Sequence, residues 1–275
     1  KTMWVTCAAS ASILEINLET AQITQISTMS LHEGFLFSSC DDITRIGSTI
    51  YMSNLWSWTY APEDVTFSTP ILSDFGAVYK MDVSTDARVI QLHWKGPSGS
   101  HGLNPITHDS QGYLYVGTAL NLKRDFMNNG ELPSYPARIW KLDQSGNVVW
   151  ENTYDKQCNA FDIRDGFLYT GVNSGWPGID TDGAFFSSEG GYGSAELVRV
   201  NTTTGVSESL MQVPQLDPAD YLVSVKFVDN TLLYATNKIW AVDYNPLTKT
   251  IMPETRRVVY DFNIYDSQIG VRQGY

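Results

Sequence analysis

The segment of residues 137–171, ARIWKLDQSGNVVWENTYDKQCNAFDIRDGFLYTG, carries the pattern that decides the fold. Short runs of aromatic and β-branched residues alternate with turns that contain Gly, Asp or Asn, which is typical of strands joined as hairpins. Four strands are predicted here, over residues 137–143, 147–154, 160–163 and 167–171.

Both halves of this pattern recur along the chain. An apolar run ending in an acid or amide occurs as SILEIN (12–17), AVYKMD (77–82), RIWKLD (138–143), ELVRVN (196–201) and KIWAVD (238–243). A turn that leads into an aromatic strand occurs as GSTIYMSN (47–54), SQGYLYVG (110–117), RDGFLYTG (164–171) and VDNTLLYAT (228–236). Self-similarity at a period of several tens of residues, all of it strand, indicates a repeat array.

The fifth copy is divided between the two ends of the chain, with VRQGY at 271–275 and KTMWVTCA at 1–8. Ends that complete one repeat predict a closed ring. We therefore expect an all-β fold, a five-bladed β-propeller of four-stranded antiparallel blades, in which the C-terminal strand joins the N-terminal blade. A β-sandwich with chance internal similarity is the alternative.

The repeats also divide the chain into blades within a single propeller domain, residues 1–275. Each blade has four strands, A to D from the axis outward. The predicted boundaries are 263–275 plus 1–33 for blade 1, 34–96 for blade 2, 97–156 for blade 3, 157–213 for blade 4 and 214–262 for blade 5.

Composition limits the possible partners. The net charge is −12 and charged residues make up only 17% of the chain, so binding to nucleic-acid phosphates is disfavoured. No apolar run is long enough to span a bilayer. This composition favours an extracellular, cell-surface or virion protein. The chain begins in mid-blade at Lys1 and so is expected to be a processed or excised segment.

The three cysteines are Cys7, Cys40 and Cys158. Cys7 and Cys40 are predicted at the same end of neighbouring blades, where a disulfide between them is possible, whereas Cys158 belongs to a more distant blade. No cysteine or histidine spacing indicates a zinc site.

Three adjacent blades carry long insertions between strands B and C, at residues 54–76, 118–136 and 172–194. Long connections in a compact domain are usually functional, and the turns on the opposite face are short. Aromatic side chains stack on sugar rings and anchor protein interfaces, although they also pack loops onto a scaffold. The predicted ligand contacts are Trp56, Trp58, Tyr60, Tyr135, Trp176 and Tyr192.

Two groups of oxygen-bearing residues are candidate metal ligands. Asp180 and Asp182, in the run DTDG, have the alternate acids and glycine with which a calcium loop begins, although the later ligands are missing and a solvated acidic turn is the favoured interpretation. Asn104, Asn159 and Asp266 precede or begin predicted A strands, where oxygen ligands from several blades meet at the channel mouth.

Two stretches connect the chain to known repeat families. NPITHDSQGYLY (104–115) and NAFDIRDGFLY (159–169) resemble repeats of NHL and gluconolactonase-type propellers, and RIWKLDQSGNVVW (138–150) is similar to the pyrroloquinoline-quinone-like (PQQ-like) repeat. The gluconolactonase resemblance implies calcium at the channel mouth, with Asn104 and Asn159 at matching positions, although no Glu begins an A strand here. The vicinal cysteine pair of quinone-dependent dehydrogenases is absent, so no quinone cofactor is expected and calcium is the remaining candidate.

Three functions are compatible with these patterns. The favoured one is a noncatalytic, lectin-like or receptor-binding propeller that binds a carbohydrate or protein surface through the B–C insertions of blades 2 to 4. The second is a channel-mouth hydrolase of the glycosidase or calcium-lactonase type, for which Asp42 and Asp266 are the first carboxylates to test. The third is a structural module in a homo-oligomer or larger assembly.

Overall fold

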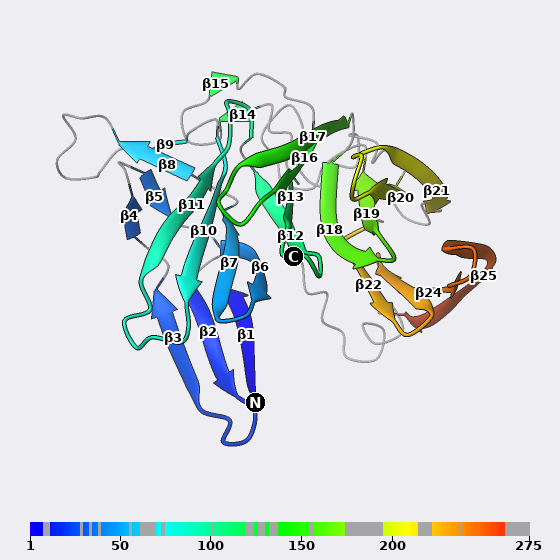
Figure 1. The fold of residues 1–275 in the computed structure, drawn as a ribbon, viewed down its shortest axis with the longest axis horizontal. Coiled ribbons are helices and arrows are strands. Elements are labelled where there is room, and N and C mark those ends of the chain that lie inside the picture. Colours follow the sequence, from blue (N-terminus) through cyan, green and yellow to red (C-terminus); the bar gives the residue numbers. More distant parts are fainter. Residues whose placement is uncertain are drawn as a thin grey trace, which may run out of the picture. The chain divides into compact units, whose positions relative to one another are not determined.

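The structure is a computed structural model in which every regular element of the described residues is a β-strand (Figure 1). The described residues are 1–7, 12–27, 30–32, 35–37, 40–54, 57–60, 70–72, 75–100, 102–118, 124–125, 130–131, 137–154, 157–173, 195–213, 222–236 and 238–261. They fall into two compact units, Lys1–Cys158 and Asn159–Tyr275.

The first unit contains three blade sheets and two further sheets formed by short strands. The strand order of blade 1 is β1(Thr2–Cys7)-β2(Ser12–Asn17)-β3(Ile23–Ser27). Blade 2 contains β6(Cys40–Ile46), β7(Thr49–Asn54), β10(Ala77–Asp82) and β11(Ile90–Lys95), and blade 3 contains β12(Leu103–His108), β13(Leu114–Thr118), β16(Ala137–Leu142) and β17(Val148–Tyr154). A further four-stranded sheet has the order β4(Ser30–His32)-β5(Phe35–Phe37)-β8(Ser57–Tyr60)-β9(Pro70–Leu72), and β14(Arg124–Asp125) pairs with β15(Gly130–Glu131).

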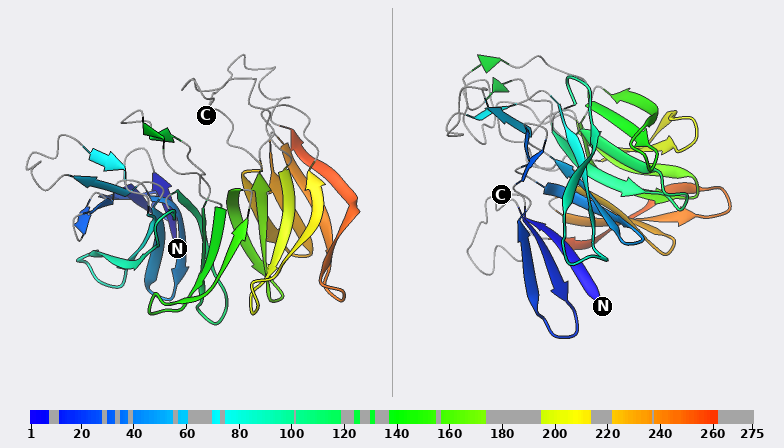
Figure 2. Two further views of the ribbon diagram at one scale, coloured as in Figure 1. Left: turned by 90° about the horizontal axis from the view of Figure 1, so that it is seen from above. Right: turned by 60° about the vertical axis from the view of Figure 1, so that its left-hand side comes forward.

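The second unit contains two four-stranded sheets, which lie side by side in both views (Figures 1 and 2). Blade 4 has the order β18(Gln157–Arg164)-β19(Phe167–Asn173)-β20(Ala195–Asn201)-β21(Ser207–Val213). Blade 5 has the order β22(Ser224–Val228)-β23(Thr231–Ala235)-β24(Lys238–Asn245)-β25(Thr250–Asp261).

This sequence of antiparallel sheets confirms the predicted fold class, an all-β five-bladed propeller. In each of blades 2 to 5, four strands pair in the order in which they follow one another along the blade, from A to D. Blade 1 has strands B, C and D among the described residues. The segment predicted to supply strand A of blade 1, residues 263–275, lies outside the described residues.

The apolar core lies between the faces of neighbouring blades rather than at one centre. Ile13 of blade 1 packs with Met52 and Tyr79 of blade 2. Val78 of blade 2 packs with Trp140 of blade 3, and Leu197 of blade 4 packs with Leu232 of blade 5. Within each unit a sheet is thus covered by the next sheet along the chain, which explains why strands B and C read as nearly continuous apolar runs.

The turns between strands C and D share one device, in which an Asn or Asp side chain accepts backbone N–H bonds two or three residues ahead. The five residues that do this are Asn17, Asp82, Asp143, Asn201 and Asn245. The sequence repeat placed Asp243 fifth in this series, and this placement was wrong. β24 has eight residues whereas its counterparts have six or seven, so Asp243 remains inside the strand, where it forms an ion pair with Arg257 at 2.8 Å.

The D strands of blades 2 to 5 each contain a bulge. The register shifts in β11 at His93, in β17 at Val149, in β21 at Leu210 and in β25 at Val259. Bulges interrupt the row of backbone groups that an edge strand offers to another chain. The pairing of β3 with β2 in blade 1 has no such shift.

Candidate recognition face and inner-strand cluster

The candidate ligand-binding residues are only partly within the described structure. Trp58 and Tyr60 lie in β8, where Trp58 is opposite Leu36 and Leu72 in the register. Of the remaining candidates, those that lie outside the described residues are Trp56, Tyr135, Trp176, Tyr192, Asp180, Asp182 and Asp266.

The blade 2 insertion was treated as a loop in the sequence, yet it contributes β8 and β9 to a sheet. Its partners β4 and β5 come from the link between blades 1 and 2. Sequence reasoning missed this pairing because the two segments are each short and are separated by strands β6 and β7. The insertion between strands B and C of blade 2 therefore shares a sheet with the link between blades 1 and 2.

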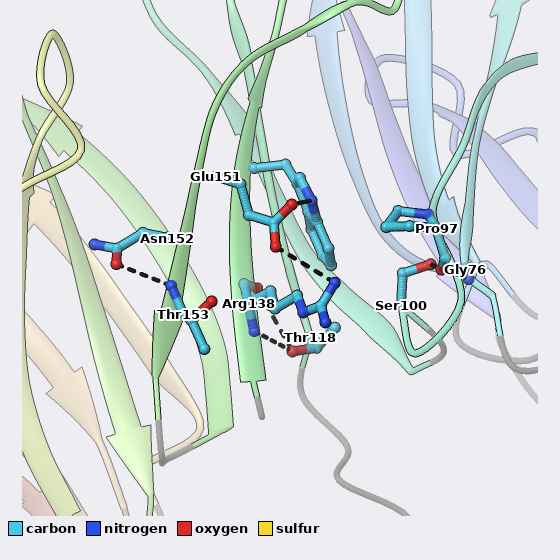
Figure 3. Close-up of polar contacts among 9 residues, drawn as sticks. Gly76, Pro97, Ser100, Thr118, Arg138, Glu151, Asn152 and Thr153 are labelled. Carbon is cyan, nitrogen blue, oxygen red and sulfur yellow. Dashed lines mark hydrogen bonds and ion pairs between the residues drawn. The ribbon is translucent and has the colours of Figure 1, made fainter. Parts of the chain in front are cut away.

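The blade 3 insertion is clamped where it leaves and re-enters the blade (Figure 3). Thr118 Oγ1, at the end of β13, accepts the backbone N–H of Arg138 at 2.7 Å. The Arg138 guanidinium forms an ion pair with Glu151 at 3.3 Å, and the buried Trp140 donates its indole N–H to the same carboxylate at 3.0 Å. Both ends of the insertion are therefore held on a rigid part of the blade.

The blade 2 insertion is held at its C-terminal end by the link that follows β11. The Ser100 hydroxyl accepts the N–H of Gly76 at 2.9 Å and donates to the carbonyl of Pro97 at 2.6 Å. The Gly76 carbonyl accepts the N–H of Gly96 at 2.9 Å. A Cβ at Gly76 would lie 2.4 Å from Leu103 Cγ, so only glycine allows this close approach.

We expect Ser100→Ala to lower the free energy of unfolding by about 2 kcal/mol, because it leaves the buried N–H of Gly76 without the acceptor that it has in the wild type. Urea unfolding followed by tryptophan fluorescence measures this difference. Ser145→Ala, in an exposed turn, is the matched control and should change stability by less than about 0.5 kcal/mol. Equal effects of the two substitutions would show that the Ser100 hydroxyl does not hold the end of the blade 2 insertion in place.

Where blades 1, 2 and 3 meet, their inner ends form a polar group that we call the inner-strand cluster: Thr6, Cys40, Asp41, Asp42, Ser53 and Asn104. Thr6 donates its hydroxyl to the Asp41 carbonyl at 3.0 Å. Ser53 Oγ donates to the backbone carbonyl of Asn104 and accepts the N–H of Asp42. The Thr6 hydroxyl thus connects blade 1 to strand A of blade 2, and the Ser53 hydroxyl connects blade 2 to strand A of blade 3.

Asp42, the first carboxylate of the hydrolase hypothesis, is bound to backbone. One oxygen accepts the N–H of Ile43 at 2.8 Å, and the other accepts the N–H of Ile106 in blade 3 at 3.0 Å. Asp162 repeats the arrangement in the second unit, where it accepts the N–H groups of Ile163 and Phe227. The repeated role indicates that both carboxylates join neighbouring blades.

Asp41 is the carboxyl group of the inner-strand cluster whose pKa is raised. Burial, together with the negative charge of Asp42, raises the pKa of Asp41 to about 6. Burial also raises the pKa of the adjacent Cys40 thiol, and the charges of Asp42 and Asp41 add to the effect. A carboxyl group that titrates near pH 6 is suited to proton transfer. The sequence shows two adjacent acids at this position, but it does not show the burial that raises the pKa of Asp41.

Asp41→Asn should stabilise the protein at pH 8 and leave it nearly unchanged at pH 4. The folded-state pKa of Asp41 is raised, so its contribution to stability is fully present below the unfolded pKa near 4 and is lost as pH rises through about 6. Removing the ionised group at pH 8 should therefore raise the unfolding free energy by on the order of 2 kcal/mol. Urea unfolding at both pH values measures this, with Asp86→Asn in an exposed turn as control. A variant that is less stable at pH 8 would contradict the sign.

The two asparagines proposed at the channel mouth do not occupy equivalent positions. Asp42 and Asp162 make corresponding bonds to the next blade, so the residue before each corresponds as well. The hairpin registers pair Cys40 and Leu103 with the last residue of strand B in blades 2 and 3, so Asn104 corresponds to Asp41 and hence to Phe161. Asn159 lies two residues before Phe161 in its strand. Among the described residues no group of three or more His, Cys, Asp or Glu is arranged to hold a metal ion. Calcium at this position therefore remains a prediction.

The three cysteines are thiols in the structure. Thr6 points toward blade 2, as does Trp4, which packs against the core of blades 1 and 2. Cys7 is also among the groups whose charge raises the pKa of the Cys40 thiol. The disulfide that the sequence allowed between these two residues is not formed in the structure.

No protein-family model and no curated protein matches the chain. Among solved structures, a protein of unknown function from Bacteroides caccae is 14% identical with a TM-score of 0.49, over 94% of this chain and 73% of that one. BamB from Moraxella catarrhalis is 11% identical with a TM-score of 0.44, over 91% of this chain and 56% of that one. Sqt1 from Saccharomyces cerevisiae is 10% identical with a TM-score of 0.46, over 94% and 71%. The fold class therefore rests on the sheet order rather than on these likenesses.

The part of the chain that the structure describes includes no helix that is long and apolar enough to cross a membrane.

Proposed function

We propose that this propeller is a noncatalytic recognition module, which binds a carbohydrate or a protein surface through the B–C insertions of blades 2 to 4. The observation that carries the proposal is the clamping of the insertions: Thr118 and Ser100 fix the points where two of them join their blades. Binding loops on a rigid scaffold lose less conformational entropy when a ligand binds.

The contrast between the two sides of each blade supports the same function. The C–D turns are short and are closed by their own Asn or Asp side chains, as at Asp143 and Asn201. The B–C insertions instead contain aromatic residues of the kind that stack on sugar rings and anchor protein interfaces, including Trp56 and Trp176. An extracellular, cell-surface or virion location fits this function and is part of the proposal.

A glycan array probed with the full chain tests the carbohydrate form of the proposal, with titration calorimetry on any sugar that binds. Trp56→Ala and Trp176→Ala should each weaken binding at least about 10-fold while the circular dichroism spectrum is unchanged. Tyr260→Ala, an exposed aromatic in β25, is the matched control and should leave affinity unaltered. Binding that survives both tryptophan substitutions would place the site elsewhere.

A channel-mouth hydrolase is the second candidate, and the raised pKa of Asp41 is the observation that favours it. Asp42 is unsuited to the role of catalytic partner because its oxygens already accept backbone N–H bonds. Hydrolysis of a panel of glycosides and lactones, with and without added calcium, tests this candidate. Activity that Asp41→Asn abolishes would support it, whereas activity retained in that variant would contradict it.

A further inference from the structure

Strand β3, the D strand of blade 1, lacks the protection that the other D strands have. Its sequence ITQIS (Ile23–Ser27) contains no charged residue, and its ladder with β2 is regular. The D strands of blades 2 to 5 combine a bulge with at least one charged residue, such as Lys95 in β11 or Glu208 in β21. Charges and bulges are the means by which proteins prevent edge strands from pairing with other chains.

The backbone of β3 has a defined open edge. Asn17 donates its N–H to the Gln22 carbonyl at 2.9 Å, so residue 22 directs its polar groups toward β2. In an antiparallel ladder these directions alternate, so Thr24 also faces β2, whereas Ile23 and Gln25 direct N–H and C=O away from it. Among the described strands none pairs with this second edge.

The side chains of β3 divide in the same regular way. Ile26 packs into the core between blades 1 and 2, so Ile23 and Gln25 lie on the opposite face. On that face Met3, Ile16 and Ile23 are directly opposite one another across the three strands. Met3 is 44% exposed and Ile23 is 59% exposed, so this apolar row continues to the open edge without being covered there.

We propose that β3 pairs antiparallel with β3 of a second copy of this chain, about a two-fold axis at Thr24. In this register Ile23 is opposite Gln25 of the second copy, and their outward N–H and C=O groups form four hydrogen bonds across the axis. A two-fold axis perpendicular to the sheet keeps the faces aligned, so the two copies of Ile23 are diagonal neighbours and the apolar row continues into the partner.

The absence of charge makes β3 an edge at which two copies of this acidic chain can pair. The chain carries a net charge of −12, so most of its surface repels another copy. Residues 20–27, TAQITQIS, contain no charge, so pairing in this register places no like charges opposite each other.

Sedimentation velocity of the full chain over a wide range of concentration tests the proposal. The wild type should show a reversible monomer–dimer equilibrium. Gln25→Pro removes only an N–H that points away from β2, and it deletes two of the four intermolecular hydrogen bonds, so the dimer should weaken about 30-fold. Ile23→Lys should have a similar effect by placing two ammonium groups side by side. Val149→Lys, in the bulged strand β17, is the matched control and should leave association unchanged.

Circular dichroism of each variant verifies that it is folded. Ile23→Lys changes only a side chain, so it still tests the contact if the proline of Gln25→Pro disturbs the strand. A wild type that sediments as a monomer at every concentration overturns the proposal. A dimer that persists in both β3 variants overturns it as well, since the contact must then lie elsewhere.

Discussion

Asp162→Asn is expected to lower the free energy of unfolding by about 3 kcal/mol, although the two side chains have the same shape. Asp162 is buried, and its carboxylate accepts the N–H groups of Ile163 at 3.0 Å and Phe227 at 2.6 Å. Lys226 adds an ion pair at 3.0 Å. An amide has only one acceptor oxygen, so its NH2 group would face one of the two backbone donors.

The midpoint and slope of urea unfolding measure this loss, and the slope should be unchanged because the unfolded chain exposes the same surface. Asp42→Asn should behave similarly in the first unit, because Asp42 makes the corresponding bonds to Ile43 and Ile106. Asp82→Asn is the control: Asp82 closes an exposed turn with an oxygen that Asn also has, and other blades use Asn at that position. A loss below about 0.5 kcal/mol for Asp162→Asn would show that the carboxylate does not join the blades.

Gly171→Val is expected to destabilise the protein by about 3 kcal/mol through overpacking. A Cβ at this position would lie 1.9 Å from Leu222 Cδ2 and 2.7 Å from Leu222 Cγ. Leu222 is fully buried in the core between blades 4 and 5, so it has no room to withdraw. The glycine in the sequence RDGFLYTG therefore permits the close packing of β19 on the residues before β22.

A double-mutant cycle tests the cause of this loss. Leu222→Ala alone should cost about 3 kcal/mol because it leaves a cavity, and Gly171→Ala alone should cost about 2 kcal/mol. Combined, the two changes should cost less than their sum, since the new methyl group occupies part of the cavity. Additive losses would mean that Gly171 is required for a reason other than the contact with Leu222.

The repeat units could be predicted because they are local. A hairpin strand pairs with its neighbour in sequence, and the turn between them is closed by its own residues, as at Asp143 and Asn201. The five apolar runs, the short turns and the antiparallel order of each blade therefore follow from residues close together in the chain. The one misplaced repeat end, Asp243, resulted from a strand that is two residues longer than the pattern predicted.

The site could be predicted only as a region. The long B–C connections were visible as interruptions of the repeat, but Ser100 and Thr118, which fix them, are ordinary polar residues until their partners are known. The role of Asp42 was also assigned differently. In the sequence it is a carboxylate at the start of an A strand, whereas in the structure it binds a backbone N–H 64 residues away.

The sequence by itself therefore determined the strands of the blades, the turns between them, the number of blades and the acidic, charge-poor composition, because each depends on neighbouring residues or on composition. Only the tertiary structure decided that β5 and β8 share a sheet, that Asp42 and Asp162 join blades, and that β3 presents an unprotected edge. The raised pKa of Asp41 belongs to the same group. Each of these depends on which distant segments remove a side chain or a backbone group from water, and that is established only when the blades pack against one another.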